Sequence, residues 1–504
     1  MAVMIEIKNC SFAYTSACAS KEDMKAAIQN INLRVEKGEC ILLCGRSGCG
    51  KTTLTRLVNG LIPYFYEGML SGETLVAGKN ICETPMYEIA KRAGSVFQNP
   101  RTQFFNVDTD SEIAFGMENL AWPPGEIARR LEQVSDEMHI RALRGRNIFA
   151  LSGGEKQKIA FASIYAVSPD VYVLDEPSAN LDLNAVEDLR RHLVKLKAQG
   201  KTILIAEHRL YYLTGVADRV IYMEKGHIEN AWPPSEFARI PDETRREMGL
   251  REWDLNRVIP ADELEHTENV LSTLQVNGVD LAYKKQPVLK GITFEAFPGE
   301  VIAITGQNGA GKSTLSWTLC GLRKESGGAL FWRGEKSGVK RRQALSYMIM
   351  QDVNYQMFAE SVEKECGFGL KNPDSGLIQH LLEDLELYQF RSRHPNTLSA
   401  GQKQRLAVAA GIAADKELLV FDEPTSGLDY DSMRRVAMLI RRLGLQKKLV
   451  FVVTHDVEFI AQACTRVLHL EGRMIAADFP VVSASMPGLL RLLHRIPEKE
   501  RSDE

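Results

Sequence analysis

The nine cysteines of this 504-residue chain include no Cys-x-x-Cys pair, which leaves a zinc module or a thioredoxin-like site without support. No run of about eighteen apolar residues occurs, so the chain is not expected to span a bilayer by itself. An excess of basic residues is also missing, since the net charge is −3, and no bulk positive field points to nucleic acid. The first residues, MAVMIEIKNC, lack the architecture of a signal peptide. Scattered cysteines suit a reducing compartment, and we expect a soluble or membrane-peripheral protein.

One glycine-rich motif is present twice. The segment GRSGCGKT at 45–52 recurs as GQNGAGKS at 306–313, and the same series of motifs follows each copy. Cores that keep their spacing while loops vary in length are typical of a duplicated domain. A chain of 504 residues with 44% hydrophobic and 25% charged residues has room for two such domains.

Apolar runs and helical segments alternate in the same order in both halves. ECILLCG and EVIAITG precede the two glycine-rich loops, and KTTLTRLVNGL and KSTLSWTLCGL follow them. Further apolar runs, VYVLDEP and LLVFDEP, end in acids, and TILIAEH and LVFVVTH end in histidine. This alternation predicts an α/β core with a mainly parallel sheet in each half. We expect a first domain at 1–235, a linker with many charges and prolines at 236–269, a second domain at 270–480, and a C-terminal helix and tail at 481–504.

The pattern GxxxxGK[ST] carries a specific chemistry. Its glycines let backbone N–H groups curl around phosphate oxygens at a helix N-terminus, whose dipole favours anions. Lys51 and Lys312 are expected to reach the β- and γ-phosphates, and Thr52 and Ser313 to offer a hydroxyl to Mg²⁺. A chance match is a serious alternative for one copy and a poor one for two copies that each lie between a strand and a helix. The nucleotide-binding residues predicted from the two loops are Gly45, Ser47, Gly48, Cys49, Gly50, Lys51, Thr52 and Thr53, and Gly306, Asn308, Gly309, Ala310, Gly311, Lys312, Ser313 and Thr314.

Two acids follow a later buried strand in each half. Asp175 and Asp422 end the strands, as a magnesium-holding acid should. Glu176 and Glu423 come next and could polarise an attacking water as general bases. Adjacent acids after a strand can also be charges at a helix start, but repetition of the triplet DEP in the same setting disfavours that alternative.

Histidine ends another predicted strand in each half. A neutral imidazole of His208 or His455 could contact a γ-phosphate oxygen there. One histidine at a strand end would more often be structural, and the repeated pair favours a role in catalysis.

The two halves resemble ATP-binding-cassette ATPases. LSGGEKQ at 151–157 matches the signature of that family, and LSAGQKQ at 398–404 is its near copy. The family order appears twice: an aromatic residue, a phosphate loop, a glutamine, the signature, the acidic strand end, a D-loop and a histidine. The resemblance implies ATP and Mg²⁺ as cofactors and ATP hydrolysis as the activity. It also implies an α/β fold of two tandem nucleotide-binding domains, each with a mainly parallel sheet core, a β subdomain and a helical subdomain.

The resemblance further implies a shared pair of sites. In that family two domains dimerise head to tail, and each ATP lies between one phosphate loop and the opposite signature. The two domains of this chain are therefore expected to pair with each other. Adenine would stack on Tyr14 and Tyr283, although each could be an ordinary strand aromatic. The other residues carried over are Gln98 and Gln351 for Mg²⁺ and the attacking water, Asp182 and Asp429 for contact with the opposite site, and Ser152, Gly153, Gly154, Glu155, Ser399, Ala400, Gly401 and Gln402 of the signatures.

The two expected sites differ mildly. Fusion in one chain raises the effective concentration of the halves for each other and lets the sites diverge. Ala400 replaces the second-position glycine of the signature, which adds a Cβ where backbone should approach phosphate. The composite site of Lys51 and Ser399 is therefore expected to be the slower one.

One stretch resembles a narrower group, the ATPases of energy-coupling factor importers. It is VFQNPRTQFFNVDTDSEIAFGMENL at 96–120, and MQDVNYQMFAESVEKECGFGL at 350–370 is an altered version. In that group the region docks a cytoplasmic coupling helix of the transmembrane subunit, while the alternative for Phe105 and Phe358 is a packed aromatic pair. The resemblance implies two partners, a transmembrane scaffold subunit and a membrane-embedded substrate-capture subunit, at the cytoplasmic face of the cell membrane. The cargo would be a vitamin, a vitamin precursor or a metal ion.

Two other classes stay open. Sugar-importer ATPases also have two tandem domains, but the sequence of residues 96–120 resembles them poorly. Tandem ATPases that act on ribosomes typically carry a long, charged helical linker, and a basic surface would suit them; this chain is slightly acidic, and we expect no nucleic-acid partner. At the end of the chain, Leu489, Leu490, Leu492, Leu493 and Ile496 lie near helical spacing. That helix is expected to fold back onto its own domain rather than face a membrane or a partner.

Overall fold

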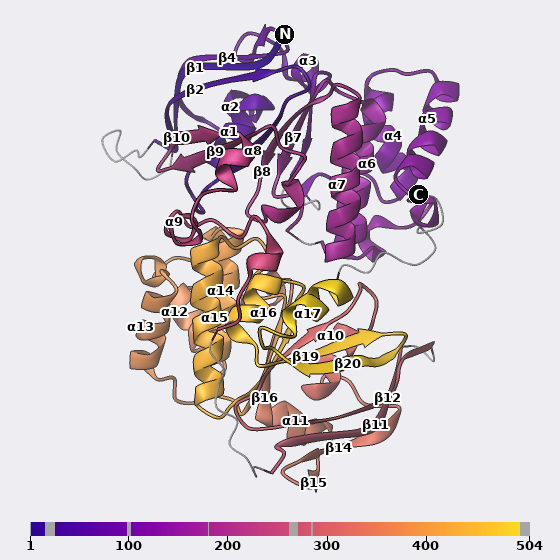
Figure 1. The fold of residues 1–504 in the computed structure, drawn as a ribbon, viewed down its shortest axis with the longest axis vertical. Coiled ribbons are helices and arrows are strands. Elements are labelled where there is room, and N and C mark those ends of the chain that lie inside the picture. The colour runs from indigo at the N-terminus through magenta and orange to yellow at the C-terminus, as the bar shows by residue number, and fades with distance from the viewer. Residues whose placement is uncertain are drawn as a thin grey trace. The chain divides into compact units, whose positions relative to one another are not determined.

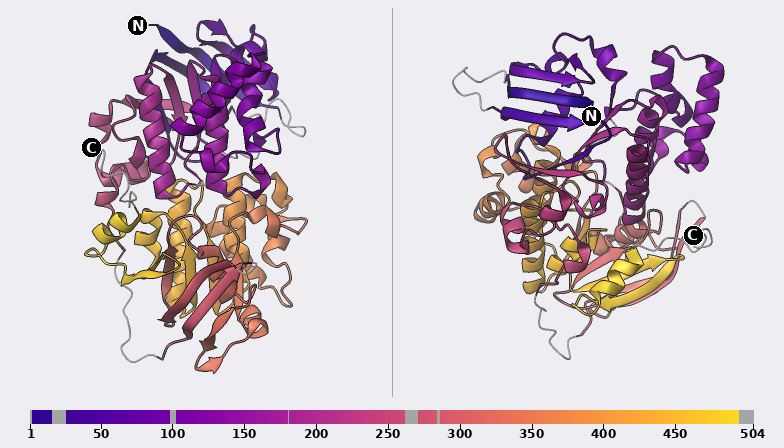
Figure 2. Two further views of the ribbon diagram at one scale, coloured as in Figure 1. Left: turned by 90° about the vertical axis from the view of Figure 1, so that its right-hand side faces the viewer. Right: turned by 45° about the horizontal axis from the view of Figure 1, so that its top comes forward.

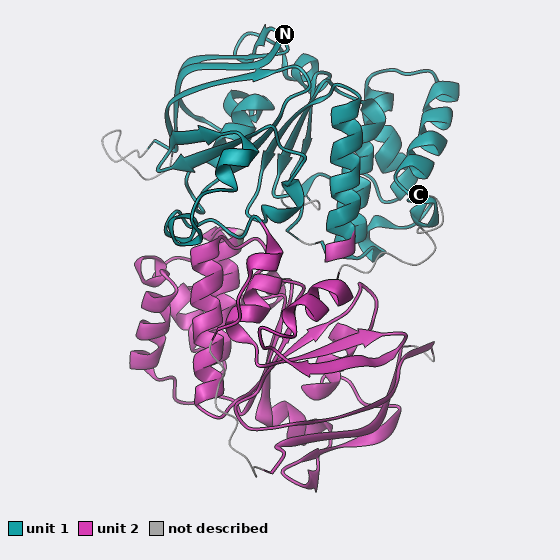
Figure 3. Cartoon of the chain, in the orientation of Figure 1, with its two compact units in different colours: residues 1–181, 185–253 teal, residues 182–184, 254–504 magenta. Residues whose placement is uncertain are grey.

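The chain forms two compact units (Figure 3). The computed structural model describes residues 2–15, 26–97, 102–179, 181–261, 271–283 and 286–493. Unit 1 comprises residues 1–181 and 185–253, and unit 2 comprises residues 182–184 and 254–504. The described residues of each unit contain one four-stranded antiparallel sheet and one six-stranded, mainly parallel sheet. The repeat in the sequence is thus a repeat of the fold, and the expected α/β class is confirmed.

The strands of unit 1 form two layers (Figure 1). The four-stranded sheet has the order β2 (Ile28–Glu36), β1 (Val3–Tyr14), β4 (Gly68–Val76) and β5 (Lys79–Asn80). The six-stranded sheet has the order β10 (His227–Trp232), β9 (Arg219–Glu224), β3 (Cys40–Cys44), β8 (Thr202–Ala206), β7 (Val171–Asp175) and β6 (Ala93–Val96). All pairs in it are parallel except β10 with β9. The carboxyl ends of five strands therefore meet at one edge.

The helices of unit 1 cover both faces of the six-stranded sheet. They are α1 (Lys51–Val58), α2 (Leu61–Tyr64), α3 (Met86–Ala90), α4 (Thr109–Asn119), α5 (Pro124–Glu137), α6 (Gly153–Val167), α7 (Leu183–Ala198), α8 (Pro234–Phe237) and α9 (Asp242–Glu247), with 3₁₀ turns η3 (Arg141–Leu143), η4 (Ile148–Ala150) and η5 (Tyr211–Leu213). Leu42 of β3 packs in a core cluster with Phe161 of α6. Leu43, its neighbour in β3, points to the other face and packs in a cluster with Leu54 of α1. Every residue of β3 is buried, as a strand covered on both faces requires.

Unit 2 repeats this arrangement. Its four-stranded sheet has the order β12 (Gln286–Ala296), β11 (Leu274–Tyr283), β14 (Gly327–Trp332) and β15 (Glu335–Lys336). Its six-stranded sheet has the order β16 (Ser346–Ile349), β17 (Leu418–Asp422), β18 (Leu449–Val453), β13 (Val301–Thr305), β19 (Arg466–Glu471) and β20 (Met474–Pro480). Only β20 pairs antiparallel in it, with β19. The β subdomain expected in each half is this separate antiparallel layer, which the turned views show for both units (Figure 2).

The helices of unit 2 follow the same order along the chain. They are α10 (Lys312–Leu319), α11 (Val339–Leu345), α12 (Val362–Cys366), α13 (Ser375–Asp384), α14 (Ala400–Ala413), α15 (Tyr430–Leu445), α16 (Val457–Ala463) and α17 (Met486–Leu493), with 3₁₀ turns η6 (Leu255–Arg257), η7 (Val353–Gln356), η8 (Tyr388–Phe390) and η9 (Pro395–Thr397). None of the helices in the described parts of the chain is long and apolar enough to cross a membrane.

The structure corrects the first part of the linker expected at 236–269. Residues up to Trp253 belong to unit 1, and the rings of Phe237 and Trp253 pack 5.1 Å apart inside its core. The buried guanidinium of Arg245 lies 2.7 Å from the carboxylate of Asp242. The charges that suggested a solvated linker are therefore partly paired inside a folded segment.

The C-terminal helix folds back onto its own unit, as expected. Met486, Leu489, Leu490 and Leu493 of α17 are buried, and α17 packs against η6. Ile496, like residues 262–269 of the expected linker, lies outside the described residues.

Candidate active sites

The glycine-rich loop of unit 1 connects β3 to α1. Gly45 and Gly50 have φ angles of 142° and 108°, which glycine adopts readily and other residues rarely do. A Cβ on Gly45 would lie 2.2 Å from the carbonyl oxygen of Met223, so no side chain fits there. The ammonium group of Lys51 donates to the carbonyl oxygens of Gly45 at 2.8 Å and Arg46 at 3.1 Å. The loop is therefore closed around its own lysine at the N-terminus of α1, a geometry suited to phosphate.

The loop of unit 2 between β13 and α10 has the same geometry. Gly306 and Gly311 have φ angles of 139° and 99°. A Cβ on Gly306 would lie 2.3 Å from the carbonyl oxygen of Leu470. Lys312 donates to the carbonyl oxygens of Gly306 at 2.7 Å and Gln307 at 3.0 Å. The remaining predicted members lie within these two loops or in the first turn of α1 and α10: Ser47, Gly48, Cys49, Thr53, Asn308, Gly309, Ala310 and Thr314.

The predicted magnesium ligands meet in both units. The hydroxyl of Thr52 donates to Asp175 Oδ1 at 3.2 Å, and the hydroxyl of Ser313 donates to Asp422 Oδ2 at 3.1 Å. Burial, followed by the nearby charge of Glu176, raises the pKa of Asp175 to about 7. Burial also raises the pKa of Asp422. A carboxylate that has lost its water in this way is stabilised by a cation.

These residues fit Mg²⁺. Within the described residues, no group of three or more His, Cys, Asp and Glu side chains is arranged to hold a metal ion, so no cage built from protein ligands alone is present there. Mg²⁺ usually takes one or two carboxylates and completes its shell with water and phosphate oxygens. One carboxylate beside one hydroxyl at the mouth of a phosphate loop is such a partial set.

Each predicted general base contacts the predicted histidine. His208 Nε2 lies 3.3 Å from Glu176 Oε1, and His455 Nε2 lies 3.7 Å from Glu423 Oε1. Both glutamates have left-handed backbone, with φ of 47° and 50°. Glutamate rarely adopts this conformation, which costs about 1 kcal/mol or more. Nothing in the sequence pattern predicted this strain.

The two predicted adenine-stacking tyrosines have different surroundings. The hydroxyl of Tyr14 accepts a hydrogen bond from Arg56 Nη1 at 3.0 Å and lies 3.1 Å from the hydroxyl of Thr53. In unit 2 the guanidinium of Arg323 lies 4.8 Å from the ring centroid of Tyr283. Sequence reasoning missed both arginines, because neither belongs to a motif.

The signature residues begin a helix in each unit. Ser152 starts α6 through a capping box with Glu155, and Ser399 starts α14 through a capping box with Gln402. Gly153 and Gly154 occupy the first turn of α6, as do Ala400 and Gly401 in α14. The exposed backbone N–H groups of such a first turn can bind an anion. That each signature completes the site of the other unit stays a prediction.

Of the two predicted loop glutamines, the structure describes only Gln351. Gln98 lies outside the described residues, and Gln351 is exposed in a bend after β16. Their neighbours have a clear structural role: the side-chain oxygens of Gln103 and Gln356 accept from the backbone N–H groups of Phe97 at 3.2 Å and Met350 at 2.7 Å. These two side chains therefore hold the backbone at Phe97 and Met350, the residues directly before the two predicted glutamines in the sequence. Asp182 is buried just before α7, and Asp429 caps α15 by accepting from Ser432 N.

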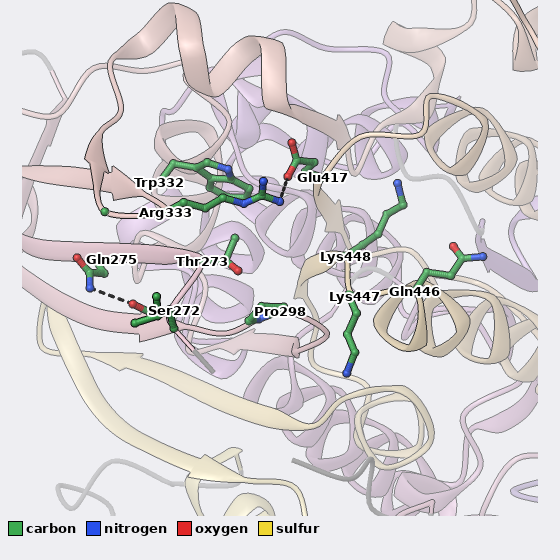
Figure 4. Close-up of a pocket in the computed structure, with 12 residues that line it drawn as sticks. Ser272, Thr273, Gln275, Pro298, Trp332, Arg333, Glu417, Gln446, Lys447 and Lys448 are labelled. Atoms are coloured by element: carbon green, nitrogen blue, oxygen red, sulfur yellow. Dashed lines mark hydrogen bonds and ion pairs between the residues drawn. The ribbon is translucent and has the colours of Figure 1, made fainter. Parts of the chain in front are cut away.

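A separate groove lies at the other end of the sheet of unit 2 (Figure 4). It has a volume of about 840 Å³, and Trp332, Arg333, Glu417 and Lys448 are among its lining residues. The Arg333 guanidinium lies 2.5 Å from Glu417. Glu417 and Lys448 directly precede β17 and β18, whereas the phosphate loop follows the carboxyl end of β13. This groove is therefore not part of the nucleotide site.

A phosphate loop, a hydroxyl–carboxylate pair and a glutamate–histidine pair, all at the carboxyl ends of parallel strands, define a P-loop nucleoside triphosphatase. This chain contains that constellation twice. It belongs to the ABC transporter family, whose model matches residues 28–179 and 289–426. Its two domains are accordingly ATP-binding domains that hydrolyse ATP.

Known relatives span nearly the whole chain. A candidate ABC transporter ATP-binding protein of Treponema denticola is 48% identical over 484 residues, which cover 94% of this chain and 97% of that protein. A candidate HMP/thiamine import ATP-binding protein of Bacillus subtilis is 32% identical over 505 residues, which cover 94% of this chain and 91% of that protein. Among solved structures, an archaeal ribosome recycling factor in complex with a ribosomal stalk protein is similar with a TM-score of 0.65 at 21% identity, covering 96% of this chain and 92% of that one. The last likeness shows the fold alone.

Proposed function

We propose that this chain is the ATPase subunit of an energy-coupling factor type importer for a vitamin, a vitamin precursor or a metal ion. It works at the cytoplasmic face of the cell membrane with a transmembrane scaffold subunit and a membrane-embedded substrate-capture subunit. ATP binding closes the two domains on each other and moves the coupling helices, and hydrolysis reopens them. The relative from Bacillus subtilis named for HMP/thiamine import supports this assignment.

The observation that carries the proposal is a stacked pair of phenylalanines with an exposed ring, built once in each unit. Phe105 is 77% exposed and stacks on Phe115 at 5.1 Å. Phe358 is 68% exposed and stacks on Phe368 at 5.8 Å. Two large apolar rings that stack together at the surface form a small apolar patch, and aromatic patches are enriched at sites where a partner docks. The alternative of a pair packed in the interior is therefore disfavoured.

A buried carboxylate holds each pair in place. Glu112 is 3% exposed, and its Oε2 accepts from the backbone N–H groups of Phe105 at 3.0 Å and Asn106 at 2.8 Å. Glu365 is 5% exposed and accepts from Phe358 N at 2.9 Å and Ala359 N at 2.7 Å. Buried charges fix backbone strongly when fully hydrogen-bonded. The rings are thus presented to solvent by a rigid support, which suits a docking surface for an apolar helix face.

The proposed chemistry is attack of water on the γ-phosphate of ATP. Lys51 and Lys312 neutralise phosphate charge, and Glu176 and Glu423 accept the proton of the attacking water. His208 and His455 contact the γ-phosphate and orient those carboxylates. Mg²⁺ held by the Thr52–Asp175 and Ser313–Asp422 pairs supplies charge neutralisation at the phosphates when it is bound.

Co-purification tests the proposal. The double variant F105S/F358S should lose the hydrophobic membrane proteins that co-purify with the wild-type chain from its own cells, yet keep its ATPase activity in detergent-free buffer. Tyr87→Ser is the matched control, because Tyr87 is 64% exposed elsewhere on unit 1. Retention of the membrane proteins by the double variant would refute the docking role. Recovery of the wild-type chain with ribosomes rather than with membrane proteins would refute the transport assignment.

A further inference from the structure

A buried carboxylate ties the two catalytic segments of unit 1 together. Glu207 directly precedes His208 and is 2% exposed. Its Oε1 accepts from Ser178 N at 3.0 Å and from the hydroxyl of Tyr212 at 2.9 Å. Its Oε2 accepts from the backbone N–H groups of His208 at 2.8 Å and Arg209 at 3.2 Å. One side chain therefore joins the loop after the catalytic glutamate to the backbone of the catalytic histidine.

Arg209, the residue after His208, also joins this segment to the loop after Glu176, through its guanidinium group. Arg209 is 8% exposed, and its Nη1 donates to the carbonyl oxygens of Ser178 at 3.3 Å and Leu181 at 3.0 Å. Burial and the neighbouring Glu207 raise the pKa of Tyr212 well above its usual value, so this phenol stays a donor to the carboxylate. The Glu207 carboxylate thus accepts four hydrogen bonds, two at each oxygen.

Unit 2 ties the corresponding loop differently. Thr454 and Asp456 stand where unit 1 has Glu207 and Arg209. Asp456 Oδ2 accepts from the hydroxyl of Thr425 at 3.1 Å. The carbonyl oxygen of Glu423 accepts from Gln404 Nε2 at 3.2 Å, which links the loop to α14.

The equivalent of Gln404 in unit 1 makes no such link. Gln157 is 4% exposed, and both polar atoms of its side chain lack a hydrogen-bond partner among the described residues. In unit 1 the segment around the histidine holds the loop through Glu207 and Arg209, and Gln157 does not contribute the link that Gln404 makes in unit 2.

We infer that Glu207 and Arg209 are positioning residues of the unit 1 site: they hold the loop after Glu176 and the backbone around His208 as one rigid element, so that the glutamate–histidine contact is preformed. The shorter contact in unit 1, 3.3 Å against 3.7 Å in unit 2, agrees with this role. The inference rests on the proposed roles of Glu176 and His208, and it makes the two sites inequivalent for a reason separate from Ala400.

The test measures steady-state ATP hydrolysis by the full chain carrying Glu423→Gln, so that turnover comes from the unit 1 site. Glu207→Gln keeps the shape of the side chain but turns an NH₂ group toward two backbone donors. We expect kcat to fall about tenfold or more while KM for ATP changes less than about twofold, because the phosphate loop that binds ATP is untouched. Arg209→Met should lower kcat in the same direction, and Arg209→Lys should restore part of the loss, since an ammonium can still donate to the two carbonyls.

Controls separate this role from general destabilisation. Arg190→Met removes a half-exposed arginine of α7 that pairs with Glu187 at 3.1 Å, and it should leave kcat and KM unchanged. An unchanged kcat in Glu207→Gln, or parallel changes of kcat and KM, would overturn the inference. If Glu207→Gln does not fold, the comparison of Arg209→Met with Arg209→Lys tests the inference instead. A kcat for Arg209→Lys no higher than that of Arg209→Met would count against the inference. Glu176→Gln on the same background tests the role of Glu176 as general base. Continued hydrolysis by that variant would refute this role, independently of the result for Glu207→Gln.

Discussion

Replacing Asp175 with asparagine should stabilise unit 1 at alkaline pH while it abolishes hydrolysis at that site. Burial raises the pKa of this carboxyl to about 7, with a further contribution from the nearby charge of Glu176. In an unfolded chain the same group titrates near pKa 4. Folding without Mg²⁺ therefore opposes ionisation of Asp175 at physiological pH.

The sign and size of the change in stability with pH follow from this difference in pKa. A carboxyl whose pKa is raised in the folded state stabilises the fold below the unfolded pKa, and this contribution is lost as pH rises through the folded pKa. From about pH 4 to about pH 7 the wild type thus loses stability relative to a neutral isostere, to a limit of about 4 kcal/mol above pH 7. Between pH 5 and pH 8 the advantage of Asp175→Asn should grow by about 2–3 kcal/mol.

The assay is urea unfolding in EDTA at several pH values from 5 to 8, with hydrogen exchange of β7 and β8 to assign the transition to unit 1. The quantity of interest is the change with pH in the stability difference between variant and wild type, because asparagine also alters the contact with Thr52. Adding Mg²⁺ and ATP should make the wild type more stable than Asp175→Asn, since only the wild type can bind the metal through this carboxylate.

Asp170→Asn is the matched control, because Asp170 is exposed and its partner Lys201 lies 3.8 Å away. Its stability difference from wild type should show little change with pH. A difference for Asp175→Asn that stays constant from pH 5 to pH 8 would refute the reasoning that burial makes this carboxylate costly without a cation.

Three shorter predictions follow from other contacts. Arg56→Met should weaken ATP binding to unit 1 by about fivefold to tenfold, because Tyr14 loses a charged donor, and fluorescent-nucleotide titration in a Lys312→Ala background measures this; unchanged affinity would contradict it. Arg245→Met should destabilise unit 1 by about 3 kcal/mol, because it removes the ion pairs of a buried guanidinium with Asp242 and with the buried Glu252, and a melting temperature within about 1 °C of wild type would contradict it. Ala400→Gly should raise ATP turnover if the added Cβ slows one site, and equal or lower steady-state turnover would argue against that idea.

The sequence was sufficient for the parts of the fold that repeat. Every apolar run read as a buried strand is one: ECILLCG contains β3, VYVLDEP contains β7 and TILIAEH contains β8. Strands covered on both faces are continuous apolar runs with few other interpretations, and a glycine pattern between a strand and a helix is nearly unambiguous. The pairs Thr52–Asp175 and Ser313–Asp422 could be predicted because both partners belong to motifs.

The sequence was insufficient where a contact depends on residues without a motif. Arg245 and Asp242 look like linker charges in the sequence, and only the folded unit 1, in which Arg245 is buried, shows that they form an ion pair. Arg56 lies on the exposed side of an ordinary helix pattern, and its partner Tyr14 is far away in the chain. Glu207 precedes a predicted catalytic residue, yet a buried acid beside a histidine carries no pattern of its own. Tertiary placement decides all three cases.

The backbone of the two glutamates proposed as general bases gives an independent argument for that role. Glu176 and Glu423 each follow a strand in left-handed conformation, and each N–H donates to a carbonyl of the neighbouring strand, Ala206 O at 2.8 Å and Val453 O at 2.9 Å. Glycine would occupy such a position without strain, whereas glutamate costs about 1 kcal/mol or more there. Each carboxylate contacts the histidine that faces the phosphate loop in the proposed mechanism. The same strain at the same position in both units is accounted for if the carboxylate is held in place for the reaction with water.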